Sequence, residues 1–377
     1  MKSIGKTALL AAVFVGSLMA LVEIKGGTPS GNKIHRMIFI ETVDDWRKCT
    51  LQNCRIINDV GSVMFAPSSS PSMLTTEVID PGFSFTQLIL SWNATMLDTI
   101  SVLHFSVDVS PDSEKWQTFD YQAWGAQIDG DTSERGSKNI QGLGRIVTDF
   151  LVLEKPMHYA RVSLAAVGLP GAHGVNLRRL SLSFSSNESD WKTYNKIHSA
   201  LARPEYGKVK LAVPYFTQRS LPSNLSGNCC SPTSVSMVLN YYGRSVTPEE
   251  FAYLVYDPRG EIYGNWPYNA AAAYIVGMGR TWVETHCSFD EIYDEVAAGR
   301  PVVISIAYGY DELPHSPIHE ALEGHLITVV GFDGPDVVIC NDPAGHNVED
   351  GIVNYPRREL EIIWQKHGGV AYHIWPD

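Results

Sequence analysis

Two adjacent cysteines come just before a segment typical of a helix start. Cys229 and Cys230 are followed by Ser-Pro-Thr-Ser, and apolar residues then recur at helical spacing as far as Tyr242. Proline is favoured at the first helical position, so Pro232 predicts that Cys230 lies just before a helix N-terminus. The partial positive charge there favours the thiolate, which is the nucleophilic form of cysteine. The segment therefore predicts a nucleophile for acyl transfer at Cys230, with a buried structural thiol as the alternative.

A histidine and an aspartate lie at the ends of two predicted strands. His325 opens the first strand, Asp342 closes the second, and the turn Asp333–Asp336 joins them. If this turn closes the hairpin, Ile327 lies opposite Asp342, and His325 is the diagonal neighbour of Asp342 on the same face. A carboxylate at that position fixes the tautomer of an imidazole and stabilises the imidazolium. A strand-end histidine beside a turn aspartate is also common without catalysis, but the chain order Cys, His, Asp favours a catalytic triad.

A glutamine upstream of the cysteines is a candidate for stabilising an oxyanion. Gln218 ends the segment Val-Pro-Tyr-Phe-Thr-Gln and lies twelve positions before Cys230. Its amide could join the backbone N–H of Cys230 in an oxyanion hole. A surface glutamine at a strand end is the alternative.

Two other groups of residues could form a metal site or line a substrate cleft. A metal site could be built from His315, His319 and His325 with Glu320 and Glu323. Pro314 and Pro317 interrupt any regular helix there, so we expect no metal ion and no organic cofactor. Asn265 and Trp266 either line a substrate cleft or belong to a structural loop.

The elements around these residues mix helices and strands from about Leu211 onward. Most helices come first and most strands later, which predicts an α+β domain. The predicted helices are Ser231–Tyr242, Pro248–Val255, Phe289–Ala298, Arg357–Lys366 and a packed helix around Ala270–Ala273. The predicted strands are Pro301–Ala307, Leu326–Phe332, Val337–Cys340 and Val370–Trp375.

Residues 36–186 have a different pattern. Short stretches of alternating polar and apolar residues, such as Gln87–Trp92, Leu103–Asp108 and Arg161–Ala165, are separated by turn residues. This pattern predicts an antiparallel β-sandwich. The polar stretch 187–207 is predicted to be a linker that leads into a second domain at 208–377.

The first 24 residues resemble a targeting segment. Lys2 and Lys6 precede an apolar stretch, Thr7–Val22, which has the length of a signal peptide and lacks a good cleavage site. We therefore expect a signal peptide or an uncleaved N-terminal anchor, and an exported protein that is secreted or associated with the cell envelope. The net charge of −12 argues against nucleic acid as a partner, because phosphate binding needs clustered lysine and arginine.

The remaining four of the six cysteines are outside the candidate site. Cys49 and Cys54 are close enough in sequence to close a small loop, and export predicts that they form a disulfide while Cys230 stays free. Cys287 and Cys340 have apolar neighbours and are predicted to be buried thiols.

These segments together resemble the papain-clan cysteine peptidases related to the bacteriocin-leader, or double-glycine, peptidases. The resemblance covers about Leu211 to Pro376. It rests on Val-Pro-Tyr-Phe-Thr-Gln218, Cys230-Ser-Pro-Thr-Ser, Gly324-His325-Leu, Tyr263-Gly-Asn-Trp-Pro267, Asn341-Asp342-Pro and the terminal Gly368–Pro376. The N-terminal half is similar, more loosely, to the β-rich domain that precedes such peptidase domains in some secreted bacterial proteins.

The resemblance implies a papain-like cysteine peptidase domain preceded by the β-sandwich. It makes Cys230 the nucleophile, His325 the base, Asp342 the orienting acid and Gln218 the oxyanion donor. The expected activity is hydrolysis of an amide or peptide bond through a thioester, on a peptide or protein substrate. An acyl transferase of the transglutaminase type and an inactive peptidase-like binding protein are the alternatives. The N-terminal domain is a candidate for binding a cell-wall or surface partner.

Overall fold

The computed structural model describes residues 35–66, 71–125, 138–168, 172–186 and 206–376. The predicted targeting segment 1–24 and nearly all of the predicted linker 187–207 lie outside the described residues. Within the described ranges, no helix has the length and apolar character needed to cross a membrane. Residues Lys33–Asp377 form one compact unit.

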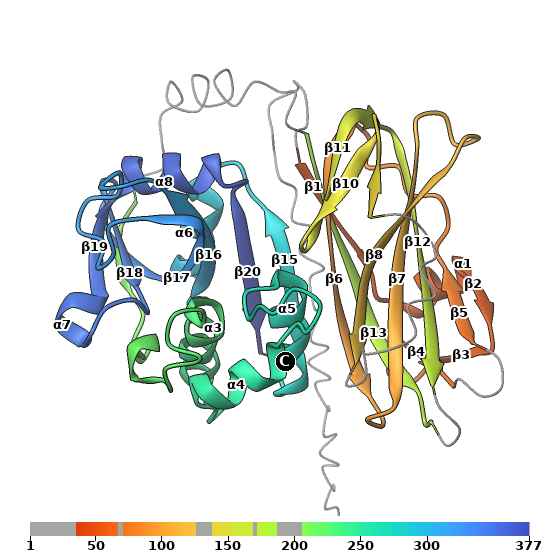
Figure 1. Ribbon diagram of the computed structural model, residues 1–377, viewed down its shortest axis with the longest axis horizontal. Helices are drawn as coiled ribbons and strands as arrows, with labels where there is room; N and C mark the ends of the chain where they lie inside the picture. The colour runs from red at the N-terminus through yellow and green to blue at the C-terminus, as the bar shows by residue number, and fades with distance from the viewer. Residues whose placement is uncertain (1–34, 67–70, 126–137, 169–171, 187–205, 377) are drawn as a thin grey trace, which may run out of the picture. The chain divides into compact units, whose positions relative to one another are not determined.

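Two antiparallel sheets make up the N-terminal lobe (Figure 1). The first has the strand order β3-β4-β13-β6-β11-β10-β9, with β1 paired to β13, and the second has the order β2-β5-β12-β7-β8. The strands of the first sheet are β1 (His35–Ile40), β3 (Cys54–Ile57), β4 (Ser62–Phe65), β6 (Phe85–Met96), β9 (Asn139–Ile140), β10 (Gly144–Val147), β11 (Phe150–Met157) and β13 (Val175–Ser185). Those of the second are β2 (Thr50–Gln52), β5 (Ser72–Thr75), β7 (Ser101–Ser110), β8 (Gln117–Gly125) and β12 (Tyr159–Gly168), and a short helix, α1 (Val43–Lys48), precedes β2.

The two sheets share one apolar core. Trp92 of β6 stacks on Phe105 of β7 with ring centroids 4.0 Å apart, and both rings are buried. Leu164 of β12 and Leu180 of β13 belong to the same cluster. The alternating residues that predicted strands here are therefore the ones that pack between the sheets, and the predicted sheet-rich, antiparallel N-terminal region is confirmed.

The predicted disulfide between Cys49 and Cys54 is wrong. Both side chains are free thiols in the structure. The Cys49 thiol donates to the carbonyl oxygen of Asp45 (3.5 Å), and the Cys54 thiol lies 3.3 Å from the carbonyl oxygens of Gln52 and Met73. Closeness in sequence did not decide the pairing, because each thiol is oriented by its own backbone acceptors.

The C-terminal lobe has a sheet of order β15-β20-β16-β17-β18-β19, with β14 paired to one end of β17. Its strands are β14 (Lys208–Lys210), β15 (Arg280–Thr285), β16 (Val302–Tyr308), β17 (Ala321–Asp333), β18 (Val337–Asn341), β19 (Ile352–Pro356) and β20 (Val370–Trp375). Its helices are α3 (Cys230–Tyr241), α4 (Pro248–Val255), α5 (Trp266–Ile275), α6 (Phe289–Ala297), α7 (Val348–Gly351) and α8 (Arg357–Lys366), with a 3₁₀ turn at Gln218–Ser220. The predicted α+β class is confirmed.

Helices cover both faces of this sheet (Figure 1). Val303 of β16 packs with residues of α3, α4 and α5, whereas the next residue, Ile304, packs with residues of α6 and α8. This alternation follows from the period of two along a strand. A strand buried on both faces has few polar positions, which explains why the sequence around Pro301–Ala307 is continuously apolar.

Polar side chains of the N-terminal lobe form hydrogen bonds along the edge strand β15. The backbone N–H of Val283 donates to Ser91 Oγ (3.1 Å), and that of Thr285 donates to Ser183 Oγ (2.9 Å). Asn93 Nδ2 donates to the carbonyl oxygen of Thr281 (2.8 Å). These bonds satisfy N–H and C=O groups that an open sheet edge leaves free, so the N-terminal lobe protects the edge of the C-terminal sheet.

We expect Asn93→Ala to lower the free energy of unfolding by about 1–3 kcal/mol, because truncation leaves buried partners of the amide without a hydrogen bond. Asn93 is fully buried, and its Oδ1 also accepts from Arg179 (2.9 Å). Ser181→Ala is the matched control, since Ser181 is equally buried but its Oγ has no hydrogen-bond partner. Urea denaturation of both variants tests this, and equal stability losses would contradict it.

Candidate active site

Cys230 is the first residue of α3 and Pro232 is the third, so the helix begins two residues before the start that Pro232 predicts. Cys229 occupies the N-cap position and makes no side-chain hydrogen bond to the helix, so no side chain of the cap covers the first N–H groups. Two further bonds fix α3 on the sheet: Ser234 Oγ donates to the carbonyl of Leu326 (2.9 Å), and Thr328 Oγ1 donates to the carbonyl of Ser234 (3.1 Å). The helix end that carries Cys230 is thereby held beside β17, the strand that carries His325.

His325 and Asp342 are hydrogen-bonded to each other. His325 Nε2 lies 2.7 Å from Asp342 Oδ1, and both side chains are buried. The other ring nitrogen is left for the thiol of Cys230, with which His325 also forms a hydrogen bond. The structure thus brings together three of the four residues singled out in the sequence, in the order thiol, imidazole, carboxylate.

The strand register that brings His325 to Asp342 includes a β-bulge. Near the turn, Phe332 pairs with Val338, one position away from the predicted register. Val330 is an extra residue in β17, and beyond it Thr328 pairs with Asn341, which restores the predicted register. The turn is therefore one residue longer than predicted, and the bulge absorbs that residue before the strands reach the site.

Asp342 has partners for both carboxylate oxygens. Oδ1 also accepts from the backbone N–H of Ala344 (2.9 Å), and Oδ2 accepts from the hydroxyl of Tyr355 in β19 (2.7 Å). The hydroxyl of Tyr215 donates to the carbonyl oxygen of Asp342 (3.0 Å). Neither tyrosine was identified from the sequence, because no local motif links them to a residue distant along the chain.

The thiol of Cys230, the imidazole of His325 and the carboxylate of Asp342 shift one another's pKa values toward the charged forms. Burial raises the pKa of Cys230, but the hydrogen bond and positive charge of His325, together with the backbone N–H groups of Leu326 and Ser231, lower it overall. Burial lowers the pKa of His325, but Asp342 and Cys230 raise it to about 10. Burial also raises the pKa of Asp342, and His325 and Tyr355 outweigh this and lower it. The site therefore favours a thiolate beside an imidazolium.

Cys229 is in a different environment from its neighbour. It is fully buried with Leu225 and Ala252, and burial together with the charge of Cys230 raises the pKa of its thiol to about 12. A thiol with this pKa is protonated at neutral pH and is a poor nucleophile. Cys287 and Cys340 are buried thiols, as predicted.

Gln218 does not contact Cys230 through any hydrogen bond that the structure records. Its side-chain amide nitrogen donates to the carbonyl of Ser226 (3.0 Å), and its backbone N–H donates to the carbonyl of Pro343 (2.9 Å). Its Oε1 is buried without a hydrogen-bond partner. An amide nitrogen carries two N–H groups, so one donor is available for a substrate oxyanion.

If that donor stabilises the oxyanion, Gln218→Ala lowers kcat by about 10²–10³-fold, the loss typical of a single oxyanion donor. Gln218→Glu has nearly the same size but replaces the donor with an acceptor, so it should lose at least as much activity. Steady-state kinetics on one acyl substrate measures both variants. Activity of Gln218→Glu close to that of the wild type would contradict the role of Gln218 as an oxyanion donor.

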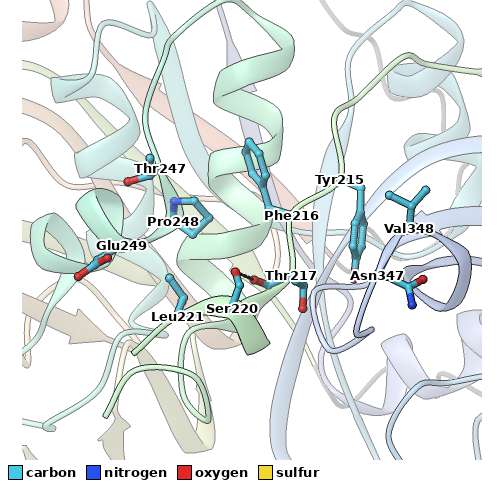
Figure 2. Close-up of a pocket in the computed structure, with 10 residues that line it drawn as sticks. All are labelled: Tyr215, Phe216, Thr217, Ser220, Leu221, Thr247, Pro248, Glu249, Asn347 and Val348. Carbon is cyan, nitrogen blue, oxygen red and sulfur yellow. Dashed lines mark hydrogen bonds between the residues drawn. The ribbon is translucent and has the colours of Figure 1, made fainter. Parts of the chain in front are cut away.

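A groove of about 560 Å³ lies along the segment that leads into Gln218 (Figure 2). Tyr215, Phe216 and Thr217 form one part of its lining, and Thr247, Pro248 and Glu249 form another. Because Tyr215 contacts the backbone of Asp342, the groove begins next to the residues that orient His325. Its lining combines apolar and aromatic side chains with the carboxylate of Glu249.

The other candidate residues have structural roles or lie away from His325 and Asp342. Asn265 is the N-cap of α5 and bonds Asp257 (2.8 Å), and Trp266 stacks on Phe150. The cleft interpretation of these two residues is therefore not supported. His319 is exposed and paired with Asp311 (3.0 Å), while His325 is buried with Asp342. Within the described ranges, His315, His319 and His325 do not belong to a group of converging metal-binding side chains.

One family model and several solved structures are similar to part of the chain. Residues 210–372 match the model of the Peptidase_C39 like family. Among solved structures, the chain is similar to one described as a C39-like peptidase from Bacillus anthracis, at 22% identity over 45% of this chain and 98% of that one, with a TM-score of 0.35. It is also similar to a double glycine motif protease from an AMS/PCAT transporter in complex with its leader peptide, at 18% identity over 46% of this chain and 100% of that one, with a TM-score of 0.29.

No protein in the curated comparison matches the chain. The family match covers the lobe that contains Cys230, His325 and Asp342. The match of residues 210–372 to this family model supports a function of the cysteine peptidase type.

Proposed function

We propose that the protein is a cysteine hydrolase that cleaves amide bonds in peptides or proteins through a thioester on Cys230. The observation that carries this proposal is the hydrogen-bonded series Cys230–His325–Asp342, with the pKa of the thiol lowered and that of the imidazole raised to about 10. A buried thiol without such a partner has its pKa raised, as Cys229 does. The arrangement activates one cysteine and leaves the other inert.

In the first half of the reaction, the Cys230 thiolate attacks the substrate carbonyl carbon. The oxyanion that forms accepts hydrogen bonds from the backbone N–H at the start of α3 and from Gln218. His325 then gives its proton to the leaving nitrogen, the carbon–nitrogen bond breaks, and a free amine departs. The acyl group remains on Cys230 as a thioester, and His325 is neutral.

In the second half, neutral His325 removes a proton from a water molecule, which attacks the thioester carbonyl. The carbon–sulfur bond breaks, a carboxylic acid leaves, and the thiolate–imidazolium pair is restored. Asp342 keeps the imidazole in one tautomer and orientation throughout, and Tyr355 holds the second carboxylate oxygen. One amide bond and one water molecule are consumed in each cycle.

A thiol-reactive acyl probe and a peptide library test the proposal together. The probe should label Cys230 and no other cysteine, and the library should show cleavage that disappears in Cys230→Ala. An added primary amine separates hydrolysis from acyl transfer, because a transglutaminase-type enzyme would convert the acyl group into a new amide. Absence of labelling in a folded chain would favour an inactive binding protein.

We also propose that the protein is exported. The basis is the sequence Lys2 and Lys6 followed by the apolar stretch Thr7–Val22. Fractionation of expressing cells should find the full chain outside the cytoplasm, and Val13→Arg, which interrupts the apolar stretch, should retain it inside. Equal distribution of the two forms would contradict export through this segment.

A further inference from the structure

A second cluster of ionisable side chains lies at the β15–β20 edge of the sheet, separate from the proposed active site. It consists of Glu284 in β15, His286 just after β15, and His373 in β20. One ligand atom from each residue lies within 4.8 Å of the others. The two imidazole Nε2 atoms are 2.7 Å apart, and His286 Nε2 is 4.0 Å from Glu284 Oε2. None of these residues takes part in the proposed hydrolysis.

The cluster is well shielded from solvent. His286 and His373 are 5% and 2% exposed, and the side chain of Glu284 is 14% exposed. Two imidazoles and a carboxylate that converge away from water must share a proton or a cation, because ionisable groups are costly to bury without a partner. Their chemical types are those that bind divalent transition metals.

Neighbouring side chains hold the ligand atoms in place. Trp282 stacks on the ring of His373 with centroids 4.7 Å apart, and its Nε1 donates to Glu284 Oε2 (2.8 Å). Glu291 Oε2 in α6 lies 3.4 Å from His286 Nδ1. A carboxylate on the far nitrogen of a histidine orients the ring and makes the near nitrogen a better ligand, a common feature of metal sites.

We propose that Glu284, His286 and His373 form a binding site for a divalent transition-metal ion, for which Zn²⁺ is the natural probe. The two nitrogens supply imidazole ligands and Glu284 supplies a carboxylate oxygen, with the fourth position open to water. Nitrogens about 2.0–2.1 Å from a tetrahedral Zn²⁺ lie about 3.3 Å apart. The imidazoles therefore separate by about half an ångström when the ion enters.

A metal at this place would join several elements of the fold. It would link β15 to β20 directly and α6 through Glu291. Glu291 Oε1 in turn lies 3.5 Å from His35 Nε2 in β1, so the linkage extends to the first strand of the N-terminal lobe. We therefore expect the ion to stabilise the folded chain rather than to take part in amide hydrolysis.

The main competing explanation is a proton shared between the two imidazoles. In that case His286 donates from Nε2 to Nε2 of His373, and the carboxylates balance the charge. A shared proton needs no metal and gives no metal stoichiometry. Metal binding distinguishes the two explanations directly.

The experiment uses the full chain with Cys230→Ala, because a thiolate beside an imidazole can itself bind Zn²⁺. Equilibrium dialysis against Zn²⁺ measures stoichiometry and affinity, and Co²⁺ absorption reports the ligand types. In this background, His373→Phe removes one ligand nitrogen and keeps a ring for stacking on Trp282. His319→Phe is the matched control, since His319 also stacks on an aromatic ring and pairs with a carboxylate, but on the surface.

We expect one Zn²⁺ per chain in Cys230→Ala and in the double variant with His319→Phe. Co²⁺ should give a nitrogen- and oxygen-ligated spectrum without thiolate bands. His373→Phe should weaken binding at least about 100-fold, and Glu291→Gln, which alters the outer carboxylate, should weaken it about 10–100-fold. Zn²⁺ should also raise the thermal unfolding midpoint of Cys230→Ala and not that of the His373→Phe variant.

Failure of Cys230→Ala to bind Zn²⁺, or unchanged affinity with His373→Phe, overturns the proposal. If His373→Phe fails to fold, as judged by circular dichroism, Glu284→Gln replaces it. Glutamine can still accept the bond from Trp282 but lacks the charged ligand oxygen. Unchanged Zn²⁺ affinity with Glu284→Gln then overturns the assignment of Glu284, and with it the proposed three-residue site.

Discussion

Replacing Cys230 with alanine should reduce hydrolysis to the background rate, a loss on the order of 10⁶-fold if the triad acts as one unit. Cys229→Ala should retain most of the activity. The two residues are adjacent, but only Cys230 bonds to His325 and has a lowered pKa. The thiol of Cys229 points into a buried apolar cluster with Leu225 and Ala252. Initial rates on one peptide substrate measure both variants.

Cys229→Ala removes only one buried sulfur atom, so its effect should be on stability more than on rate. A thermal melt of each variant checks that loss of activity in Cys230→Ala is not loss of the fold. If Cys229 is the residue labelled by an acyl probe, the assignment of the nucleophile is wrong.

Asp342→Ala should lower kcat by at least about 10⁴-fold, because His325 loses the carboxylate that fixes its tautomer and stabilises its charge. Asp342→Asn should lower kcat less than Asp342→Ala does, since the amide oxygen can still accept a hydrogen bond from the imidazole N–H of His325. Asparagine serves this role in related triads. The structure accommodates the amide nitrogen as well: it would face the hydroxyl of Tyr355, which can accept as well as donate.

Tyr355→Phe provides a graded comparison for Asp342. It removes one hydrogen bond to Oδ2 and leaves the bond between Oδ1 and His325 intact. Its effect on kcat should therefore be smaller than that of Asp342→Ala. Activity of Asp342→Ala close to that of the wild type, in a variant shown to fold, would mean that orientation of His325 does not depend on this residue.

The helix start and the hairpin could be predicted because both depend on local chemistry. Pro232 lies in the first turn of α3, so the residues around Cys230 predict a helix start there to within two residues. The pairing of His325 with Asp342 follows from strand periodicity and a short turn. The bulge at Val330 could not be predicted, and the predicted register at the site was reached because the bulge compensates for a longer turn.

Contacts between residues far apart in the chain could not be predicted from the sequence. Tyr355 reaches Asp342 from another strand, and Ser91 and Ser183 bond the edge of β15 from the N-terminal lobe. The prediction of a disulfide between Cys49 and Cys54 was wrong for a similar reason. Only the fold decides which backbone acceptors face each thiol.

The shifted pKa values of Cys230 and His325 define a range of pH in which the thiolate–imidazolium pair exists. The pKa of Cys230 is lowered, so its thiolate forms as pH rises through that lowered value. The pKa of His325 is raised to about 10, so the imidazolium persists until pH rises through about 10. Between these limits the thiolate and imidazolium coexist, and the thiol remains reactive below the free-thiol pKa of about 8.5.

The pH dependence of alkylation of Cys230 tests the central claim most directly. In the wild type, alkylation should stay fast well below pH 8.5. In His325→Ala, the thiol loses the partner that lowers its pKa most while burial still raises that pKa, so reactivity at low pH should vanish. In His315→Ala and His319→Ala the profile should match the wild type. An unchanged profile in His325→Ala would contradict the thiolate–imidazolium pair and the mechanism built on it.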